Sequence, residues 1–287
     1  MILTREPFER RTCCVYAFIY LSPKRKNRTL DLPVSIVVVK LAKGEHKTAE
    51  FMRVNKFGQV PVLVERRDDD DDDDSMRFVL TESSAILKYL SETFSKTVSA
   101  SKMYHRCAEN ERDDDANALK EKAKIWSAMD WYQTTIRSSA AGLSWHAFVA
   151  QNMGGAVSLE LSKHYEGRLK LSLDVLETKW LGDSSPFLNE RPHPSIADLL
   201  VVEDIVNLVV LKGSPFRSQL SSLEALLRTR PRIRKWIDAV SRLNRPAWDE
   251  LHRVLDVVAA SAEKKMNSGV RGHRSSNSTS TRASSRL

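Results

Sequence analysis

The sequence predicts two domains, with a small α/β unit first and a larger all-α domain after it. A chain of 287 residues is long enough for two ordinary domains, and its 41% hydrophobic content can fill two cores. Valine-rich runs typical of strands lie in the first third of the chain. The remainder carries apolar residues at helical spacing between prolines, which indicates helices.

Strands and helices alternate in the first domain, which we place at residues 31–95. Runs such as VSIVVVK are typical of buried strands, whereas stretches rich in Ala, Glu and Lys are typical of helices. Thr81 or Ser83 can cap the last helix of the domain, because a hydroxyl there accepts from the first free backbone N–H groups. Strands are expected at 34–40, 60–64 and 77–80, and helices at 42–53 and from residue 81 onward.

An unbroken acidic run, residues 68–74, separates the second and third of these strands. Like charges at this density repel one another and cannot enter a sheet, so the run is expected to extend the hairpin into solvent. Calcium binding is disfavoured, because neither a glycine nor a spaced set of ligands accompanies the run.

The second domain, residues 116–263, is predicted to contain helices alone. A polar linker, residues 96–115, precedes it. A basic tail rich in Ser and Arg, residues 264–287, follows, and it is expected to be flexible because its few apolar groups cannot offset the entropy of ordering. The predicted helices span 116–146, 159–180, 196–210, 220–227, 233–243 and 248–262.

Composition and cysteine spacing argue against several functional classes. Cys13, Cys14 and Cys107 match neither a disulfide framework nor a zinc site, so we expect a reducing compartment and no metal. The apolar run at 13–21 is too short to span a bilayer and no cleavage site follows it, so neither a membrane segment nor a signal peptide is expected. The net charge of +8 permits loose contact with nucleic acid, but the tail lacks the aromatic residues that stack on bases, so no specific nucleic-acid partner is expected.

Two features of the first domain are not explained by packing alone. Pro61 stands at the head of a strand although it has no N–H for a sheet ladder, and a cis bond there would free the Val60 N–H and C=O for a peptide-like ligand. Glu82 and Ser83 open a helix whose N-terminal end favours an anion; Ser83 would bind a carboxylate and Glu82 an amine. An edge proline in trans and a capping serine would explain each feature separately. Their combination favours a ligand with an amino-acid head and an amide body.

The segments LAKGEHKTAEFMRVNKFGQVPVLV and FVLTESSAILKYLSETF resemble the glutathione-binding domain of cytosolic glutathione transferases, in particular the theta class. The resemblance implies a thioredoxin-like first domain, an all-α second domain and a cis bond before Pro61. It also implies that the chain binds glutathione, γ-Glu-Cys-Gly, as a co-substrate. The implied contacts are Glu82 and Ser83 for the amino-acid head, the Val60 backbone for the cysteinyl amide, and His46, Lys47 or Gln59 for the glycine carboxylate.

The helical half resembles the same family. DWYQTTIRSSAAG is similar to the theta-class segment in which an arginine, here Arg137, reaches toward glutathione; a surface or interdomain salt bridge is the alternative role for this side chain. PSIADLLVVEDI, with Ser195 three residues before Asp198, is similar to the N-capping box of the family, whose Asp is structural. The resemblance extends over residues 32–262.

The first thirty residues depart from the family pattern. Theta enzymes have a strand, an S-Q-P-S/C-R-A turn whose serine donates to the glutathione sulfur, and then a helix. Here a strand is expected at 15–21 and Ser22 follows it, but a basic run replaces the helix. Ser22 is therefore either the catalytic serine of a shortened turn or part of a segment that has lost the site. A hydroxyl bond to the thiolate is worth roughly 1.5 to 3 kcal/mol, about one to two pKa units, so catalysis depends on this choice.

Two classes of function follow from these observations. The resemblance implies either an enzyme that conjugates glutathione to small apolar electrophiles or reduces organic hydroperoxides, or a binding or assembly module of the same fold without turnover. It also implies a homodimer. Ser285, Arg286 and Leu287 resemble the C-terminal peroxisomal signal of the S-K-L type, so recognition by the peroxisomal import receptor is expected, with the cytoplasm as the alternative location.

Overall fold

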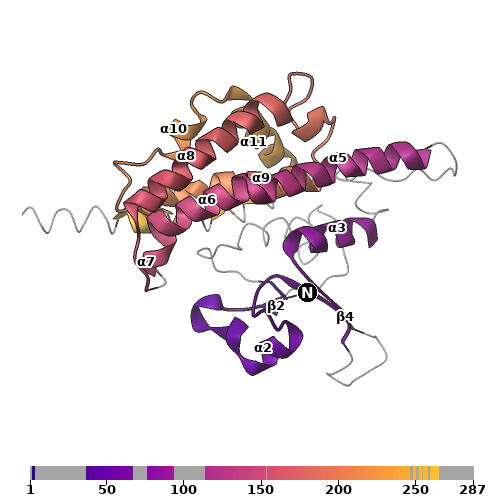
Figure 1. Ribbon diagram of the computed structural model, residues 1–287, viewed down its shortest axis with the longest axis horizontal. Helices are drawn as coiled ribbons and strands as arrows, with labels where there is room; N and C mark the ends of the chain where they lie inside the picture. Colours follow the sequence, from indigo (N-terminus) through magenta and orange to yellow (C-terminus); the bar gives the residue numbers. More distant parts are fainter. Residues whose placement is uncertain are drawn as a thin grey trace, which may run out of the picture.

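A small α/β domain lies beneath a larger layer of helices in the computed structural model (Figure 1). The structure describes residues 2–3, 37–66, 76–93, 114–152, 154–245, 248–249, 252–253, 255–257 and 259–264. The predicted fold class, a thioredoxin-like domain followed by an all-α domain, is confirmed. Ser22, the predicted strand at 15–21, the acidic run at 68–74, residues 96–113 of the predicted linker and the tail from residue 265 lie outside the described residues. Residues 114 and 115, predicted as the end of the linker, are helical instead and begin α5 (Asp114–Thr134).

Within the part of the chain that the structure describes, four strands form a sheet in the order β2-β1-β3-β4. β1 is parallel to β2 and antiparallel to β3, and β3 and β4 form an antiparallel hairpin. The strand between β2 and β3 is thus β1, which was not predicted from the sequence. Its two described residues are too few to show the alternation of apolar and polar side chains that is typical of a strand. The strands are β1 (Ile2–Leu3), β2 (Val37–Val38), β3 (Val62–Arg66) and β4 (Met76–Thr81).

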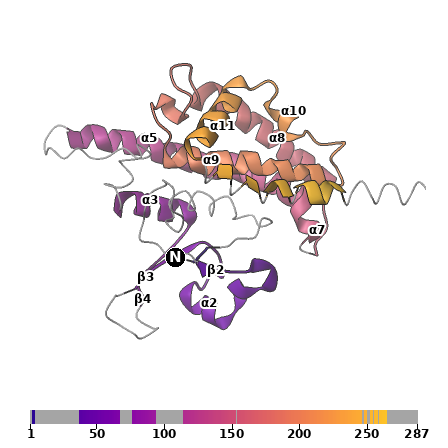
Figure 2. The same cartoon turned by 180° about the vertical axis from the view of Figure 1, so that it is seen from behind.

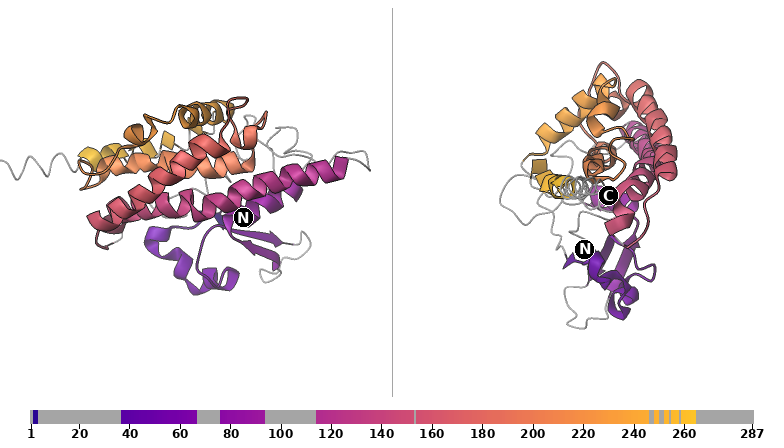
Figure 3. Two further views of the ribbon diagram at one scale, coloured as in Figure 1. Left: turned by 45° about the horizontal axis from the view of Figure 1, so that its top comes forward. Right: turned by 90° about the vertical axis from the view of Figure 1, so that its left-hand side faces the viewer.

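The two faces of β3 pack against different partners, because neighbouring residues of a strand point to opposite sides. Val62 packs in a small cluster with Val39 and Phe51. Leu63 belongs instead to the main core, with Ile86 of helix α3 (Ser83–Thr93) and many residues of the helical domain. One continuous core therefore joins the sheet and α3 to the helices. Figure 3 shows the α/β domain lying against the helical layer.

The helix predicted at 42–53 is shorter in the structure. Residues 41–47 form two 3₁₀ turns, η1 (Leu41–Lys43) and η2 (Glu45–Lys47), and the α-helix α2 covers Ala49–Val54. Gly44 separates the two turns with φ +73°, a left-handed conformation that interrupts a helix. Thr48 then caps α2 by accepting from the Phe51 N–H.

Helices account for the second domain, and α9 lies at its centre with nearly every residue buried (Figure 2). Asp198 of α9 accepts from the Ser195 N–H in the predicted capping box, and also from the Leu188 N–H and the Trp236 indole. None of the described helices is long and apolar enough to cross a membrane. The elements are α5 (Asp114–Thr134), α6 (Ile136–Ser144), the π-helical η3 (Trp145–Val149), α7 (Ala150–Asn152), α8 (Leu159–Val175), the π-helical η4 (Leu176–Trp180), the 3₁₀ turns η5 (Leu188–Glu190) and η6 (Asn207–Gly213), α9 (Ile196–Val206), α10 (Leu223–Leu227) and α11 (Pro231–Leu243).

Three predicted helices differ in their bounds. The helix predicted at 116–146 is broken at Thr135, whose backbone is not helical, and the helix predicted at 196–210 changes to 3₁₀ geometry after Val206. The predicted helix at 220–227 begins later, because Ser222 caps α10. The described residues between 248 and 264 are helical, and we call them the C-terminal helical segment.

Candidate functional site

Several predicted binding residues meet at one end of the β3–β4 hairpin. Val62 pairs with Thr81, so Val60 and Pro61 directly precede the pair and Glu82 and Ser83 directly follow it. Antiparallel pairing of Ile2 with Val62 directs the chain of β1 toward the same end of the sheet. The strand register therefore brings the proline turn and the start of α3 together.

The peptide bond between Val60 and Pro61 is cis, as the family resemblance implies. Both residues are buried, and the Val60 side chain packs against Val39, Leu41 and Phe51. Because its side chain is occupied by this packing, Val60 can contact a ligand only through its main chain.

The loop before the proline is fixed by two side chains. Asn55 is buried; its Nδ2 donates to the Gln59 carbonyl at 2.6 Å, and its Oδ1 accepts from the Phe57 N–H at 3.1 Å. The Lys47 Nζ donates to the Gly58 carbonyl at 3.2 Å. Asn55 was not predicted from the sequence as a site residue, although an Asn whose side chain bonds the backbone two residues further on is a known turn signal.

His46 and Lys47 of η2 lie against this loop. A Cβ at Gly58 would lie 2.8 Å from the Lys47 Nζ and 3.0 Å from the His46 carbonyl, so only glycine permits this contact. Gly58 also has a left-handed φ of +56°. The structure thus brings His46, Lys47 and the Gln59 backbone into one neighbourhood, beside the turn at Pro61.

The start of α3 has an unusual backbone. Glu82 has φ +64°, a left-handed conformation that is uncommon for a side chain of this size. Such outliers persist where the surrounding structure enforces them, and they are enriched at ligand sites. The exposed Glu82 accepts through its carbonyl from the Ile86 N–H, Ser83 is buried, and no acidic residue occupies the first turn of α3. The N–H groups of this turn therefore present positive potential without a carboxylate of the same turn beside them.

Arg137 lies on α6, and its Nη1 donates to the Asp204 Oδ1 of α9 at 2.7 Å. The Tyr132 hydroxyl donates to the same carboxylate. This ion pair is largely buried and lies within the helical domain, so it is neither the surface nor the interdomain salt bridge given as the alternative. The glutathione-binding role of Arg137 stays a prediction. Among the described residues no group of His, Cys, Asp and Glu side chains is suited to hold a metal ion.

Comparison with known proteins identifies the family. The family described as "Glutathione S-transferase, N-terminal domain" matches residues 28–93. Glutathione S-transferase T1 of Arabidopsis thaliana is 31% identical over 233 residues, which cover 81% of this chain and 83% of the relative. Glutathione S-transferase T2 of the same plant is 31% identical over 219 residues; these cover 76% of this chain but 32% of the relative, so this chain spans about a third of that protein.

A solved structure matches almost the whole chain. The crystal structure of human glutathione transferase theta-2, a complex with glutathione and an unknown ligand, has a TM-score of 0.66 and 26% identity, and the match covers 92% of this chain and 90% of that one. The shared fold, the cis bond before Pro61 and the relatives along most of its length lead to one conclusion. This chain belongs to the glutathione S-transferase family, and within it to the theta class.

Proposed function

We propose that this chain is a glutathione transferase that joins reduced glutathione to small apolar electrophiles and reduces organic hydroperoxides. The observation that carries the proposal is the meeting of two segments, Gln59–Val60–Pro61 and Glu82–Ser83, at one end of the β3–β4 hairpin. The first segment provides main-chain hydrogen-bonding groups at Val60. The second segment opens α3, and the start of a helix favours an anion. Together they suit a ligand that is itself a peptide with a carboxylate.

Each proposed contact follows from the chemistry of glutathione. Ser83 and the N-terminal N–H groups of α3 bind the carboxylate of the γ-glutamyl head, and Glu82 binds its ammonium group. The Val60 main chain pairs with the cysteinyl amide. His46, Lys47 or Gln59 binds the glycine carboxylate, and the contact between η2 and Gly58 supports this assignment.

The reaction requires a thiolate, because the neutral thiol is a weak nucleophile. The sulfur attacks an electrophilic carbon and displaces its leaving group, and the thiol proton passes to solvent. With a hydroperoxide the sulfur attacks the terminal oxygen and releases an alcohol; a second glutathione then reduces the sulfenic acid, which gives the disulfide and water. We assign the hydrogen bond to the thiolate, on sequence grounds, to Ser22.

A module that binds glutathione without turnover is the second candidate. It is favoured by the position of β1 at Ile2–Leu3, because Ser22 is nineteen residues beyond the end of that strand, whereas the family serine follows its first strand directly. In that case Ser83 and the Val60 main chain still hold the tripeptide, but no hydroxyl lowers the pKa of its thiol.

Turnover and binding measured on the same variants separate the two candidates. Conjugation of an aryl epoxide, reduction of cumene hydroperoxide and calorimetric glutathione binding are compared in the wild type, Ser22→Ala and a control, Ser172→Ala on α8. Turnover that is lost in Ser22→Ala with binding retained supports the enzyme and its catalytic serine. Binding without turnover, unchanged by Ser22→Ala, leaves only the binding module.

We also propose that the chain forms a homodimer. Phe78 and Val79 are exposed on β4, which is the last strand in the described sheet order, and Leu119 is exposed on α5. Exposed apolar side chains of this size suit a second copy of the chain. Sedimentation equilibrium of Phe78→Glu against the wild type tests this, and an unchanged mass would exclude β4 from the interface.

For its location we propose the peroxisome, provided that Leu287 is the last residue of the protein. The Ser285, Arg286, Leu287 tripeptide supports import through the receptor for S-K-L-type signals. A fluorescent fusion to the N-terminus should enter peroxisomes, and the same fusion without these three residues should remain in the cytoplasm. Import of the shortened fusion would contradict the proposal.

A further inference from the structure

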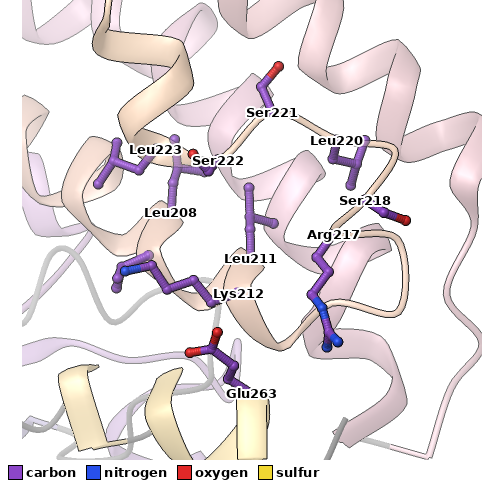
Figure 4. A pocket seen from close by; sticks show the side chains of 11 residues that line it. Leu208, Leu211, Lys212, Arg217, Ser218, Leu220, Ser221, Ser222, Leu223 and Glu263 are labelled. Atoms are coloured by element: carbon purple, nitrogen blue, oxygen red, sulfur yellow. The ribbon is translucent and has the colours of Figure 1, made fainter. Parts of the chain in front are cut away.

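We propose a second ligand site in the helical domain, for small carboxylates with an apolar body. It goes beyond the proposed transferase function, because it lies away from the hairpin end at which glutathione is placed. A cavity of about 360 Å³ opens between η6, the loop that follows it and the start of α10 (Figure 4). Figures 1 and 2 place α10 on the side of the helical domain opposite the α/β domain.

The floor of the cavity is apolar and rigid. Leu208, Leu211 and Leu220 line it and also belong to the main hydrophobic core, and Leu223 completes the floor. Side chains fixed by core packing keep the cavity in shape without a ligand. Known ligand pockets have volumes of roughly 300 to 1,000 Å³, so this cavity lies near the lower end of the range and suits a small ligand.

Two cationic side chains, Lys212 and Arg217, line the cavity together with one acid, Glu263. Lys212 pairs with Glu224 at 3.2 Å. Figure 4 shows Glu263 near Lys212, whereas Arg217 lies toward the other side. We assign the ligand carboxylate to Arg217, because its planar guanidinium matches a carboxylate and because it lies on the side of the cavity away from Glu263. A guanidinium has five N–H donors, so it can bind a ligand alongside a protein partner.

Glu263 reaches the cavity because the C-terminal helical segment packs tightly against η6. A Cβ at Gly213 would lie 2.3 Å from the Ala262 Cβ, so only glycine allows the two backbones to approach this closely. The next residue, Glu263, is thereby held at the cavity. Its carboxylate opposes an anionic ligand, and removing its charge should strengthen binding.

Octanoate titrated into the full-length protein in the presence of saturating glutathione tests the site by calorimetry. Octanoate should bind, 1-octanol should bind at least about tenfold more weakly, and octylamine should show no binding. Arg217→Gln should weaken octanoate binding by about fivefold or more and leave 1-octanol unchanged, whereas Glu263→Gln should strengthen octanoate binding by about two- to fivefold. Arg228→Gln, at an exposed position outside the cavity lining, is the matched control and should have no effect.

The proposal is overturned if octanoate does not bind at millimolar concentration, or if it binds Arg217→Gln and the cavity-filling variant Leu223→Trp as tightly as the wild type. Circular dichroism of both variants checks that they remain folded, so that a loss of binding reports on the cavity. Binding that appears only after removal of residues 265–287 would also overturn it, because the chain itself would then occupy the cavity.

Discussion

Replacing His252 with glutamine should destabilise the protein and remove part of its dependence on pH. His252 belongs to the C-terminal helical segment, and its Nε2 lies 3.4 Å from the Oε2 of Glu203, a fully buried residue of α9. Its Nδ1 lies 2.8 Å from the Trp248 carbonyl, and the Trp248 ring stacks on the imidazole at 3.9 Å. Since a carbonyl only accepts, Nδ1 carries a hydrogen, and Nε2 then faces a carboxylate.

This geometry favours the imidazolium. Burial opposes the charge, but the hydrogen bond and charge of Glu203, the Trp248 carbonyl and the charge of Asp256 together raise the pKa of His252. Burial raises the pKa of Glu203, His252 opposes that rise, and neighbouring Asp204 adds to it. Asp204 itself is paired with Arg137.

The sign of the pH effect follows from the raised pKa of His252. The stabilisation that the protonated imidazole of His252 contributes is fully present below about pH 6.5, the value for an unfolded histidine, and is lost as the pH rises through the folded value. Breaking a buried ion pair by removing one partner costs about 3 to 5 kcal/mol. The 3.4 Å separation and the 14% exposure of the imidazole place His252→Gln near the lower figure, about 3 kcal/mol at pH 6.

Urea unfolding at pH 6 and pH 9 measures the effect in the wild type, His252→Gln, Glu203→Gln and the double variant. The wild type should lose more stability between the two pH values than His252→Gln does, and the double variant should be less destabilised than the sum of the single ones. His164→Gln, an exposed histidine of α8, should behave as the wild type. Equal pH dependence in the wild type and His252→Gln would refute the coupling.

Three further substitutions test the fold and the loop. Asp198→Ala leaves four buried donors without an acceptor and should lower the free energy of unfolding in urea by about 4 kcal/mol. A loss below about 1 kcal/mol would contradict this. Gly142→Ala places a methyl group 2.4 Å from the Tyr165 ring and should cost about 1 to 3 kcal/mol by thermal unfolding, whereas Gly167→Ala, in open space on α8, should cost nothing. Asn55→Ala releases the loop before the proline turn and should raise the glutathione KM about three- to tenfold with little change in kcat. A fall in kcat as large as the rise in KM would argue that Asn55 does more than position the glutathione-binding loop.

Local patterns predicted much of the fold. Residues 159–180 were expected to be helical and are, as α8 and η4, because an apolar stripe and the cap at Ser158 are local signals. The β3–β4 hairpin was likewise predicted from its valine-rich runs. The capping box of Ser195 and Asp198 was predicted because both partners lie within one turn.

Features that depend on distant contacts were not predicted. β1 has only two residues, and only its pairing with β2 and β3 makes it a strand. The Arg137 partner, Asp204, is 67 residues away, and the Glu203 partner, His252, lies on another helix. The break at Thr135 gives no proline or glycine signal, so the sequence favoured one long helix.

The residues of the candidate site also fall into these two groups, those predicted from a local pattern and those whose role depends on distant contacts. Pro61 was predicted as a site residue because a proline conflicts with the strand pattern around it. Glu82 and Ser83 were predicted because they open a helix, whose N-terminal end favours an anion. Asn55 was missed because its role depends on the path of the loop around it. That these residues share one end of the hairpin follows from the register of β3 and β4, which no single segment encodes.

Calorimetric titration of reduced glutathione into the full-length protein is the most direct test of the central claim, that the hairpin end and the start of α3 form a glutathione site. We expect saturable binding by the wild type, about five- to tenfold weaker binding by Ser83→Ala, and unchanged binding by the control Ser172→Ala. No binding of glutathione at millimolar concentration, or equal affinity in the wild type and Ser83→Ala, would contradict it.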